Sequence, residues 1–202
     1  MNRRACFERK TKETEISASI NLDGKGDCEI HTPIGFFSHM LQSFAQHGLF
    51  DIQLKAEGDI RVDQHHLVED CGIVLGKVFN RALGNKKGIN RAGYFVYPMD
   101  DALAVVAVDI SGRPFLQYDV IFTRQFCGQM NTDLLIDFLY AFSVHLNANV
   151  VVRMPFGRSD HHKMEAIFKA FGKAMRMACS KDLRERESIP SLKGVIDNDR
   201  DR

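Results

Sequence analysis

A His-His-x-x-Glu motif occurs twice in this chain and constrains its fold more than any other feature. The first copy runs from His65 to Glu69, and the second runs from His161 to Glu165, 96 positions later (161 − 65). Each copy leads into an apolar pattern with helical spacing that contains Gly and Ala. Two matching copies argue against a chance pair of surface histidines, and they predict paired sites of metal binding or catalysis.

The spacing within each motif predicts how its side chains are directed on a helix. Neighbouring histidines on an α-helix point about 100° apart, so the two are badly placed to serve one metal ion. The Glu follows the first His by four residues and the second by three, so it shares a face with either. We therefore expect two metal ions, with the ligands of each motif divided between them.

The duplication extends well beyond the motifs. Residues 39–47 match residues 137–145 at an offset of 98 (137 − 39), and positions near the start of each half match at an offset of 88 (101 − 13). Matched pairs include Leu41 and Leu139, Phe44 and Phe142, His47 and His145, Glu13 and Asp101, and Lys25 and Arg113. An internal repeat is the simplest account. We divide the chain into two repeats, about 1–88 and 89–182, and a C-terminal substrate-binding tail, 183–202.

Hydrophobic patterns predict a similar order of elements in the two halves. Alternation predicts strands, and apolar residues every three or four positions predict helices. In the first half we expect strands over residues 10–22, 28–31 and 50–56, the first two forming a hairpin, and helices over residues 36–47 and 67–83. In the second half we expect strands over residues 94–97, 103–110, 115–122 and 148–154, and helices over residues 133–145 and 164–178. The predicted class is α+β, with two sheet-plus-helix halves packed as one domain over 1–202.

Composition narrows the kinds of partner. The 202 residues are 45% hydrophobic and 26% charged, which is ordinary for a globular protein, and the net charge of +1 predicts binding to neither nucleic acid nor an acidic membrane surface. No apolar run is long enough to span a membrane, and the first residues lack the apolar core of a signal peptide. The five cysteines are widely spaced without a Cys-x-x-Cys, which indicates reduced thiols in a cytoplasmic protein.

The repeat identifies candidate metal ligands outside the motifs. His39 and Asp137 are repeat partners, and both are side chains that manganese or iron accepts. Since each half holds only three or four candidates, ligands from different copies of the chain can converge on one site. The eight candidates, four for each of two ions, are His39, His65, His66, Glu69, Asp137, His161, His162 and Glu165.

A second group of residues suits an anion. Arg113 follows a glycine in a predicted turn, and the tail places a hydroxyl, a charge and backbone N–H groups close together, as phosphate binding requires. The anion candidates are Arg91, Arg113, Lys169, Ser191 and Lys193. Glu13 closely follows Arg9, Lys10 and Lys12, cations that favour its ionised form, and an ionised carboxylate beside a bound substrate can act as a base.

Taken together, these segments resemble the imidazoleglycerol-phosphate dehydratase family. The resemblance runs from residues 9–14 to residues 190–195 and includes residues 35–41, 98–101, 109–114 and both motifs with their flanks. It implies a duplicated α+β fold of the ribosomal protein S5 domain 2-like kind. It also implies a hydro-lyase of histidine biosynthesis that converts D-erythro-imidazoleglycerol phosphate into imidazole-acetol phosphate.

The resemblance further implies two Mn²⁺ ions per active site, which would stabilise an imidazolate form of the substrate. It implies a homo-oligomer, typically of twenty-four chains built from trimers, with the active site between subunits. The family's metal positions fall on the eight candidates above. Its substrate positions fall on Glu13, Gln42, Arg91, Arg113, Lys169, Ser191 and Lys193, and catalytic roles fall on Glu13, Glu69 and Glu165.

Three positions depart from the family pattern. Ser38 and Gln64 stand where the family usually has Asp, and Asp137 stands where His is common. Loss of carboxylates that support ligating histidines weakens metal binding. Two alternatives to an active enzyme therefore stay open: a metal-weakened or inactive homologue that serves as an assembly subunit, and a metal-storage or scaffold cage. The complete set of substrate-site residues favours the enzyme over the cage.

Overall fold

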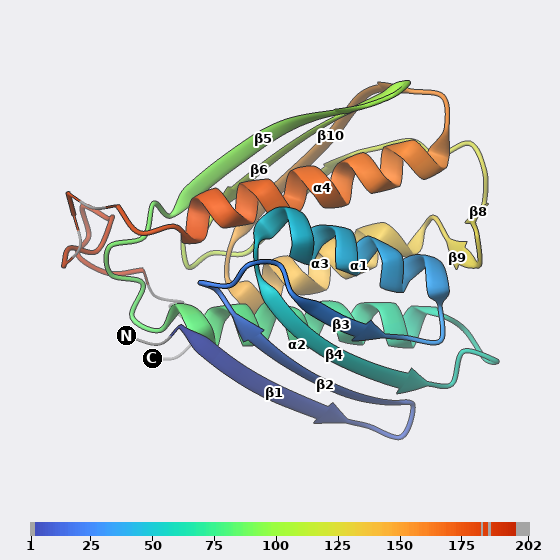
Figure 1. Cartoon of the computed structure of the whole chain (residues 1–202), viewed down its shortest axis with the longest axis horizontal. Helices are drawn as coiled ribbons and strands as arrows, with labels where there is room; N and C mark the ends of the chain where they lie inside the picture. The colour runs from blue at the N-terminus through green and yellow to red at the C-terminus, as the bar shows by residue number, and fades with distance from the viewer. Residues whose placement is uncertain (1–2, 183, 186, 197–202) are drawn as a thin grey trace.

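Two four-stranded sheets enclose a layer of four helices (Figure 1), in a computed structural model that describes residues 3–182, 184–185 and 187–196. The first half contains β1 Arg4–Lys10, β2 Thr14–Asn21, β3 Cys28–His31, α1 Gly35–Gly48, β4 Asp51–Gly58 and α2 His65–Leu83. The second half contains β5 Ala92–Met99, β6 Ala102–Asp109, β7 Phe115–Asp119, β8 Phe126–Cys127, β9 Met130–Asn131, α3 Leu134–Leu146, β10 Asn149–Gly157 and α4 Asp160–Cys179. Part of the predicted tail, residues 183, 186 and 197–202, lies outside the described residues, as do residues 1–2.

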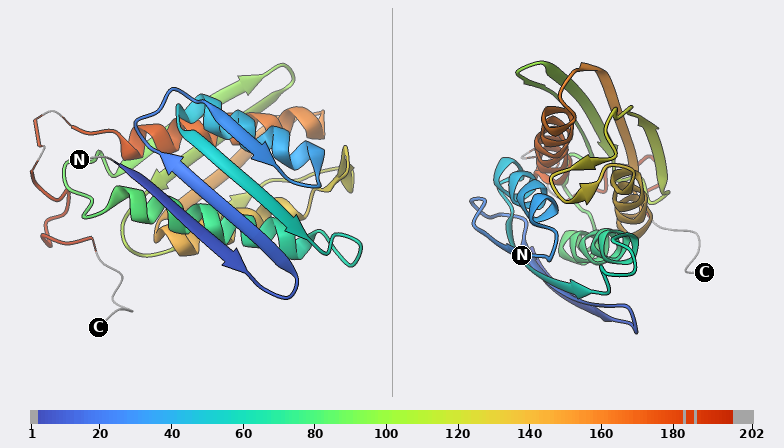
Figure 2. Two further views of the ribbon diagram at one scale, coloured as in Figure 1. Left: turned by 60° about the horizontal axis from the view of Figure 1, so that its bottom comes forward. Right: turned by 90° about the vertical axis from the view of Figure 1, so that its right-hand side faces the viewer.

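The two sheets have the same topology, which confirms the duplicated α+β fold. Their strand orders are β1-β2-β4-β3 and β5-β6-β10-β7. In each sheet the third listed strand pairs antiparallel on one side and parallel on the other. The second half differs by the short β8–β9 hairpin, which lies between β7 and α3. Seen from the end, the helices lie between the sheets (Figure 2).

The predicted hairpin of strands 10–22 and 28–31 is wrong. β3 pairs in parallel with β4, with Ile30 opposite Leu54, and α1 provides the crossover that parallel pairing requires. The predicted strand 10–22 also starts later, at Thr14, because a separate strand β1 precedes it and pairs with it through a turn at residues 11–13. Charged residues on the exposed face of β1 hid its alternation. The strand predicted over 115–122 ends at Asp119.

The helices pair across the two halves rather than within them. α2 packs against α3 and α1 packs against α4, and glycines permit both close approaches. A Cβ on Gly76 would lie 2.8 Å from the carbonyl oxygen of Phe142, and one on its repeat partner Gly172 would lie 2.5 Å from that of Phe44. The rings of Phe44 and Phe142 meet at 6.3 Å between centroids, so one continuous core contains residues of both halves.

In the described part of the chain, no helix is long and apolar enough to cross a membrane. All five cysteines are free thiols; Cys71, Cys127 and Cys179 are buried.

Candidate functional site

The first motif occupies the first turns of α2. The Asp63 carboxylate accepts the His65 N–H at 2.8 Å, which helps to satisfy a free backbone donor where the helix begins. The His65 ring lies between two carboxylates: Nε2 is 3.7 Å from Glu69 Oε2, and Nδ1 is 3.2 Å from Asp137 Oδ2. Asp137 comes from α3, so the cross-half pairing of α2 and α3 builds this cluster.

The second motif occupies the equivalent place in α4. Ser159 caps the helix by accepting the His162 N–H at 3.4 Å. His161 Nε2 lies 3.3 Å from Glu165 Oε2, and Lys169 Nζ lies 2.9 Å from the other oxygen of Glu165. Burial would raise the pKa of Glu165, but the hydrogen bond and charge of Lys169, with smaller contributions from His39 and His161, lower it on balance. His39 of α1 therefore stands near this cluster as Asp137 stands near the first.

The second histidine of each motif is oriented by a carboxylate. His66 Nδ1 lies 3.1 Å from Asp59 Oδ1, and His162 Nδ1 lies 2.5 Å from Asp101 Oδ1. Asp59 raises the pKa of His66, and His162 together with the backbone N–H of Ser159 lowers the pKa of Asp101. A carboxylate that holds one ring nitrogen leaves the other for a second partner, which is the arrangement of most metal-binding histidines. At His162 this second nitrogen, Nε2, lies 3.6 Å from the Asp100 carboxylate.

The eight predicted metal ligands thus form two groups, one in each cross-half helix pair. Imidazole and carboxylate donors are chemically suited to manganese or another divalent transition metal. Within the described residues of one chain, however, no three His, Cys, Asp or Glu side chains come close enough together to hold an ion. The donor types fit a metal, and the geometry of a single chain leaves each group incomplete.

Glu13 lies in the turn between β1 and β2, beside the first motif. Its side chain is exposed, and after the hydrogen bond of Asp59 its charge also raises the pKa of His66, so Glu13 lies within electrostatic reach of that ring. The turn is held by Thr11 Oγ1, which accepts the N–H groups of Glu13 at 3.0 Å and Thr14 at 2.9 Å. The carbonyl of Glu13 accepts the Asp59 N–H at 3.1 Å.

The anion candidates do not form one cluster. Arg91 makes a bidentate pair with Asp109, at 2.7 and 3.0 Å, and donates to the Pro190 carbonyl at 2.9 Å, which brings the tail to it. Ser191 Oγ accepts the Lys193 N–H at 3.2 Å, so these two tail residues lie together next to Pro190. Lys169 lies instead in the second motif's cluster, and the last anion candidate, Arg113, follows the turn glycine Gly112. Gln42, the other substrate position that the resemblance implies, is exposed on α1.

The two ends of α4 carry different groups of predicted residues. His161 lies at the start of this helix, while the Arg91 N–H donates to the carbonyl of Ala178 near its end. At 1.5 Å per residue, the 17 residues from His161 to Ala178 (178 − 161) span roughly 25 Å. The motif and Arg91 with the tail are therefore too far apart in one chain to contact the same small molecule.

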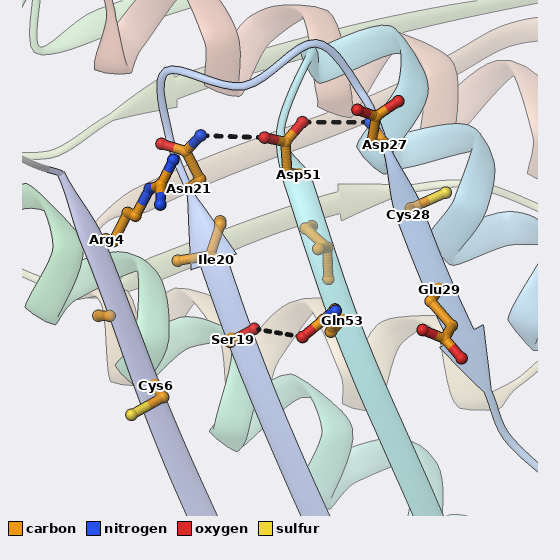
Figure 3. A pocket seen from close by; sticks show the side chains of 12 residues that line it. Arg4, Cys6, Ser19, Ile20, Asn21, Asp27, Cys28, Glu29, Asp51 and Gln53 are labelled. Carbon is orange, nitrogen blue, oxygen red and sulfur yellow. Dashed lines mark hydrogen bonds between the residues drawn. The ribbon is translucent and has the colours of Figure 1, made fainter.

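A hollow of about 690 Å³ lies on the outer face of the first sheet, away from the helices (Figure 3). Its most polar edge is occupied by internal hydrogen bonds: Asp51 accepts from Asn21 at 2.9 Å and from the Asp27 N–H at 3.2 Å. It is lined by residues of β1, β2, β3 and β4 and their flanks and by none of the predicted site residues. Its polar groups brace the turn between β2 and β3.

Sequence reasoning missed two carboxylates near the site, Asp59 and Asp70. Asp59 lies in a polar loop, where an orienting residue has no local signature. Asp70 gave a signal in the sequence, since it stands three residues after Leu67 and four before Val74, on the predicted apolar side of a helix, and the structure shows it buried.

Comparison with known proteins shows which family this chain resembles. A sequence model of the family "Imidazoleglycerol-phosphate dehydratase" matches residues 32–175. The imidazoleglycerol-phosphate dehydratase of Koribacter versatilis (strain Ellin345) is 52% identical over 194 residues, covering 96% of this chain and 100% of the relative. That of Caldicellulosiruptor saccharolyticus is 48% identical over 197 residues, covering 97% of this chain and 100% of the relative.

Solved structures agree with the sequence comparisons. The imidazoleglycerol-phosphate dehydratase of Staphylococcus aureus superposes with a TM-score of 0.79 at 32% identity, covering 88% of this chain and 100% of the other. The enzyme of Pyrococcus furiosus, in complex with (S)-C348, superposes with a TM-score of 0.80 at 33% identity, covering 94% of this chain and 99% of the other.

Proposed function

Since the chain belongs to the imidazoleglycerol-phosphate dehydratase family, whose members are hydro-lyases, we propose that it dehydrates D-erythro-imidazoleglycerol phosphate to imidazole-acetol phosphate in histidine biosynthesis. We also propose that the reaction depends on two manganese ions per active site and takes place in the cytoplasm.

The observation that carries this proposal is the pair of matching clusters. In both, a His and a Glu lie on successive turns of one helix, and the neighbouring His is oriented by a separate carboxylate. In both His66 and His162, Nε2 is the ring nitrogen left to bind a metal, and at His162 the Asp100 carboxylate lies 3.6 Å from it. Bound manganese would supply Lewis-acid stabilisation of the negative charge that develops on the substrate's imidazole ring.

Glu13 is the proposed base. The substrate proton that is lost sits on carbon, so removing it requires a positioned group that is ionised. The exposed carboxylate of Glu13, on a braced turn within electrostatic reach of His66, supports this role toward a ring bound at the first motif. Glu69 and Glu165 are proposed to hold metal, which would bind the imidazole ring of the substrate.

The phosphate end of the substrate would be held by Arg91 and the C-terminal tail. Arg91 is fixed by Asp109 and joined to the tail at Pro190, next to the Ser191 hydroxyl and Lys193. Guanidinium and hydroxyl donors in a preformed arrangement suit a phosphate dianion. We assign Arg113, Lys169 and Gln42 to the same substrate from their family positions.

We propose that each active site is completed by neighbouring copies of the chain, in a homo-oligomer of twenty-four chains built from trimers. Two observations support a site between subunits. The described residues of one chain gather no three metal donors, and roughly 25 Å separate His161 from the anchoring point of Arg91. A neighbouring copy that brings its own motif end to this one would add the missing metal donors, and a copy that brings its Arg91 end would add the phosphate-binding group.

The test is an assay of the purified protein across added metals. We expect water loss from imidazoleglycerol phosphate with manganese, and loss of that activity when a chelator removes the metal. Absence of turnover at every manganese concentration, in protein that still assembles, would support the inactive homologue in place of the enzyme. A protein that binds manganese without binding the phosphorylated substrate would support the storage cage.

A further inference from the structure

Asp70 follows the proposed ligand Glu69 directly, and it is buried on the apolar side of α2. A buried carboxylate is costly unless it is paired and hydrogen-bonded. Asp70 has both kinds of partner: its Oδ1 accepts from Arg9 Nε at 2.9 Å, and its Oδ2 accepts from the Thr14 hydroxyl. Both partners lie outside α2, on the strands that flank the turn of Glu13.

A continuous series of hydrogen bonds connects Asp70 to the backbone of Glu13. The Thr14 hydroxyl donates its hydrogen to Asp70. In the 3.2 Å contact between the Thr11 and Thr14 hydroxyls, Thr11 is therefore the donor. The Thr11 oxygen in turn accepts the Glu13 N–H at 3.0 Å. Each bond in such a series polarises the next, so the whole series is stiffer than isolated bonds.

The other side of the Glu13 peptide is held as well. Its carbonyl accepts the N–H of Asp59, and the Asp59 carboxylate orients His66. The Glu13 backbone is therefore connected to α2 at two points. One connection runs through Asp59 to His66, and the other runs through the two threonine hydroxyls to Asp70, the neighbour of Glu69.

The series of hydrogen bonds from Asp70 to the Glu13 backbone forms a tether that has no equivalent in the second half. The position that matches Asp70 is Ala166 (70 + 96), and the position that matches Glu13 is Asp101, which contacts its motif histidine directly. The tether is thus absent from the half whose matching carboxylate is an orienting group. It is present in the half whose carboxylate must reach the substrate.

We propose that Asp70 is a positioning residue for the reaction: through the Thr14 and Thr11 hydroxyls it fixes the distance between the Glu13 carboxylate and the helix that carries Glu69. This inference rests on the proposed role of Glu13 as the base. A base must be held to within a fraction of an ångström, since a displacement of about 1 Å can cost about 100-fold in rate.

Two substitutions break the series at different points while they keep the shape of the side chain. Thr14→Val removes the hydroxyl, and Asp70→Asn weakens the acceptor. We expect kcat to fall by about 10- to 100-fold in both, with KM and bound manganese unchanged, because the base moves and the ligands stay. Thr14→Ser keeps the hydroxyl and should restore most of kcat. A loss of manganese that parallels the loss of kcat would overturn the proposal, since Asp70 would then act on Glu69.

The decisive measurement is a double-mutant cycle with Glu13→Gln. If Asp70 acts through Glu13, then Thr14→Val causes no further loss of kcat once Glu13 is already Gln. A full further loss would show a general structural role and overturn the proposal. Wild-type kcat in Glu13→Gln alone would refute the base itself, and the positioning role with it.

A readout independent of activity separates the tether from the proposed function. Hydrogen exchange of the Glu13 amide should become faster in Thr14→Val and Asp70→Asn and stay slow in Thr14→Ser, with or without manganese. Unchanged exchange in the first two variants would show that no tether exists, even in a fully active enzyme. Faster exchange in a protein without turnover would support the tether and count against the dehydratase assignment.

Discussion

The two halves of this chain share a backbone plan and use matching positions differently. Glu13 and Asp101 are repeat partners, yet Glu13 stays exposed on a turn while Asp101 turns inward to His162 and accepts the N–H groups of Arg158 at 2.9 Å and Ser159 at 2.7 Å. In the first half a different residue, Asp59, orients the motif histidine. The two halves therefore share their helices and strands, but the carboxylate that orients the motif histidine comes from a different loop in each half.

The residues before the two motifs show the same division. Gln64 donates to the Gln129 carbonyl at 2.6 Å and accepts the Asn131 N–H at 3.1 Å, while its repeat partner Asp160 accepts the N–H groups of Thr123 and Arg124 at 2.9 and 2.7 Å. Both side chains therefore hold the segment that contains β8 and β9, which only the second half possesses. One does so as a neutral amide and the other as a buried charge.

The largest expected effect comes from removing the motif glutamates. Glu69→Gln and Glu165→Gln should each weaken manganese binding by more than the roughly 10- to 100-fold typical of residues that only support a ligand. When manganese binding is lost, assembly and turnover should be lost as well. Metal analysis and sedimentation of both variants provide the comparison. Full metal content in Glu69→Gln would refute its ligand role, and unequal losses would show that the two ions differ in affinity.

The periodic parts of the fold were predictable, because repeated apolar spacing directly reports a buried face. The duplication, the four helices and most strands follow from it. Pairing was not predictable: β3 joins β4 through a helical crossover, and α2 packs on α3 of the other half, choices that depend on close approaches such as Gly76 to Phe142.

At the site, the predictable residues were those inside a repeated motif. His66 and Glu69 have copies 96 positions later, so their pattern carried a signal. Asp59 has no such copy, and its role exists only after folding brings it to His66. The separation of Arg91 from the motifs was equally hidden, because sequence alone gives no position along α4.

The buried charge of the second half should matter next. Asp160 pairs with Lys163 at 2.8 Å with both side chains buried, and breaking such a pair from one side costs about 3 kcal/mol. Burial raises the pKa of Asp160, but its hydrogen bonds to Lys163 and Thr123 lower it on balance. A depressed pKa contributes stability above the unfolded value of about 4, and that contribution is lost as the pH falls through the folded value.

Urea unfolding of Asp160→Asn at fixed protein concentration tests this. The variant should be less stable than the wild type at pH 7, and the difference should shrink as the pH falls below about 4. A difference that stays constant down to pH 3 would show that shape, and not charge, makes Asp160 important.

The orienting carboxylates should have a smaller effect. Asp59→Asn and Asp101→Asn each keep an acceptor but lose the charge that supports the histidine, so manganese affinity should fall by about 10- to 100-fold. Asp101→Asn should fall further, since Asp101 also holds two N–H groups at the start of α4. Titration of metal-free protein with manganese measures both. Equal affinities for the variants and the wild type would show that neither histidine binds metal.

The smallest effect is expected at Gln64. Its two hydrogen bonds to the β8–β9 hairpin are neutral and partly exposed, so Gln64→Ala should cost about 1 kcal/mol and the loss should not vary between pH 7 and pH 3. Gln64→Glu keeps the acceptor for Asn131 but replaces the donor to Gln129, which isolates one bond. Urea unfolding beside Asp160→Asn gives the matched comparison. A loss at Gln64 as large and as pH-dependent as that at Asp160 would show that the hairpin itself, and not the buried charge, distinguishes the two halves.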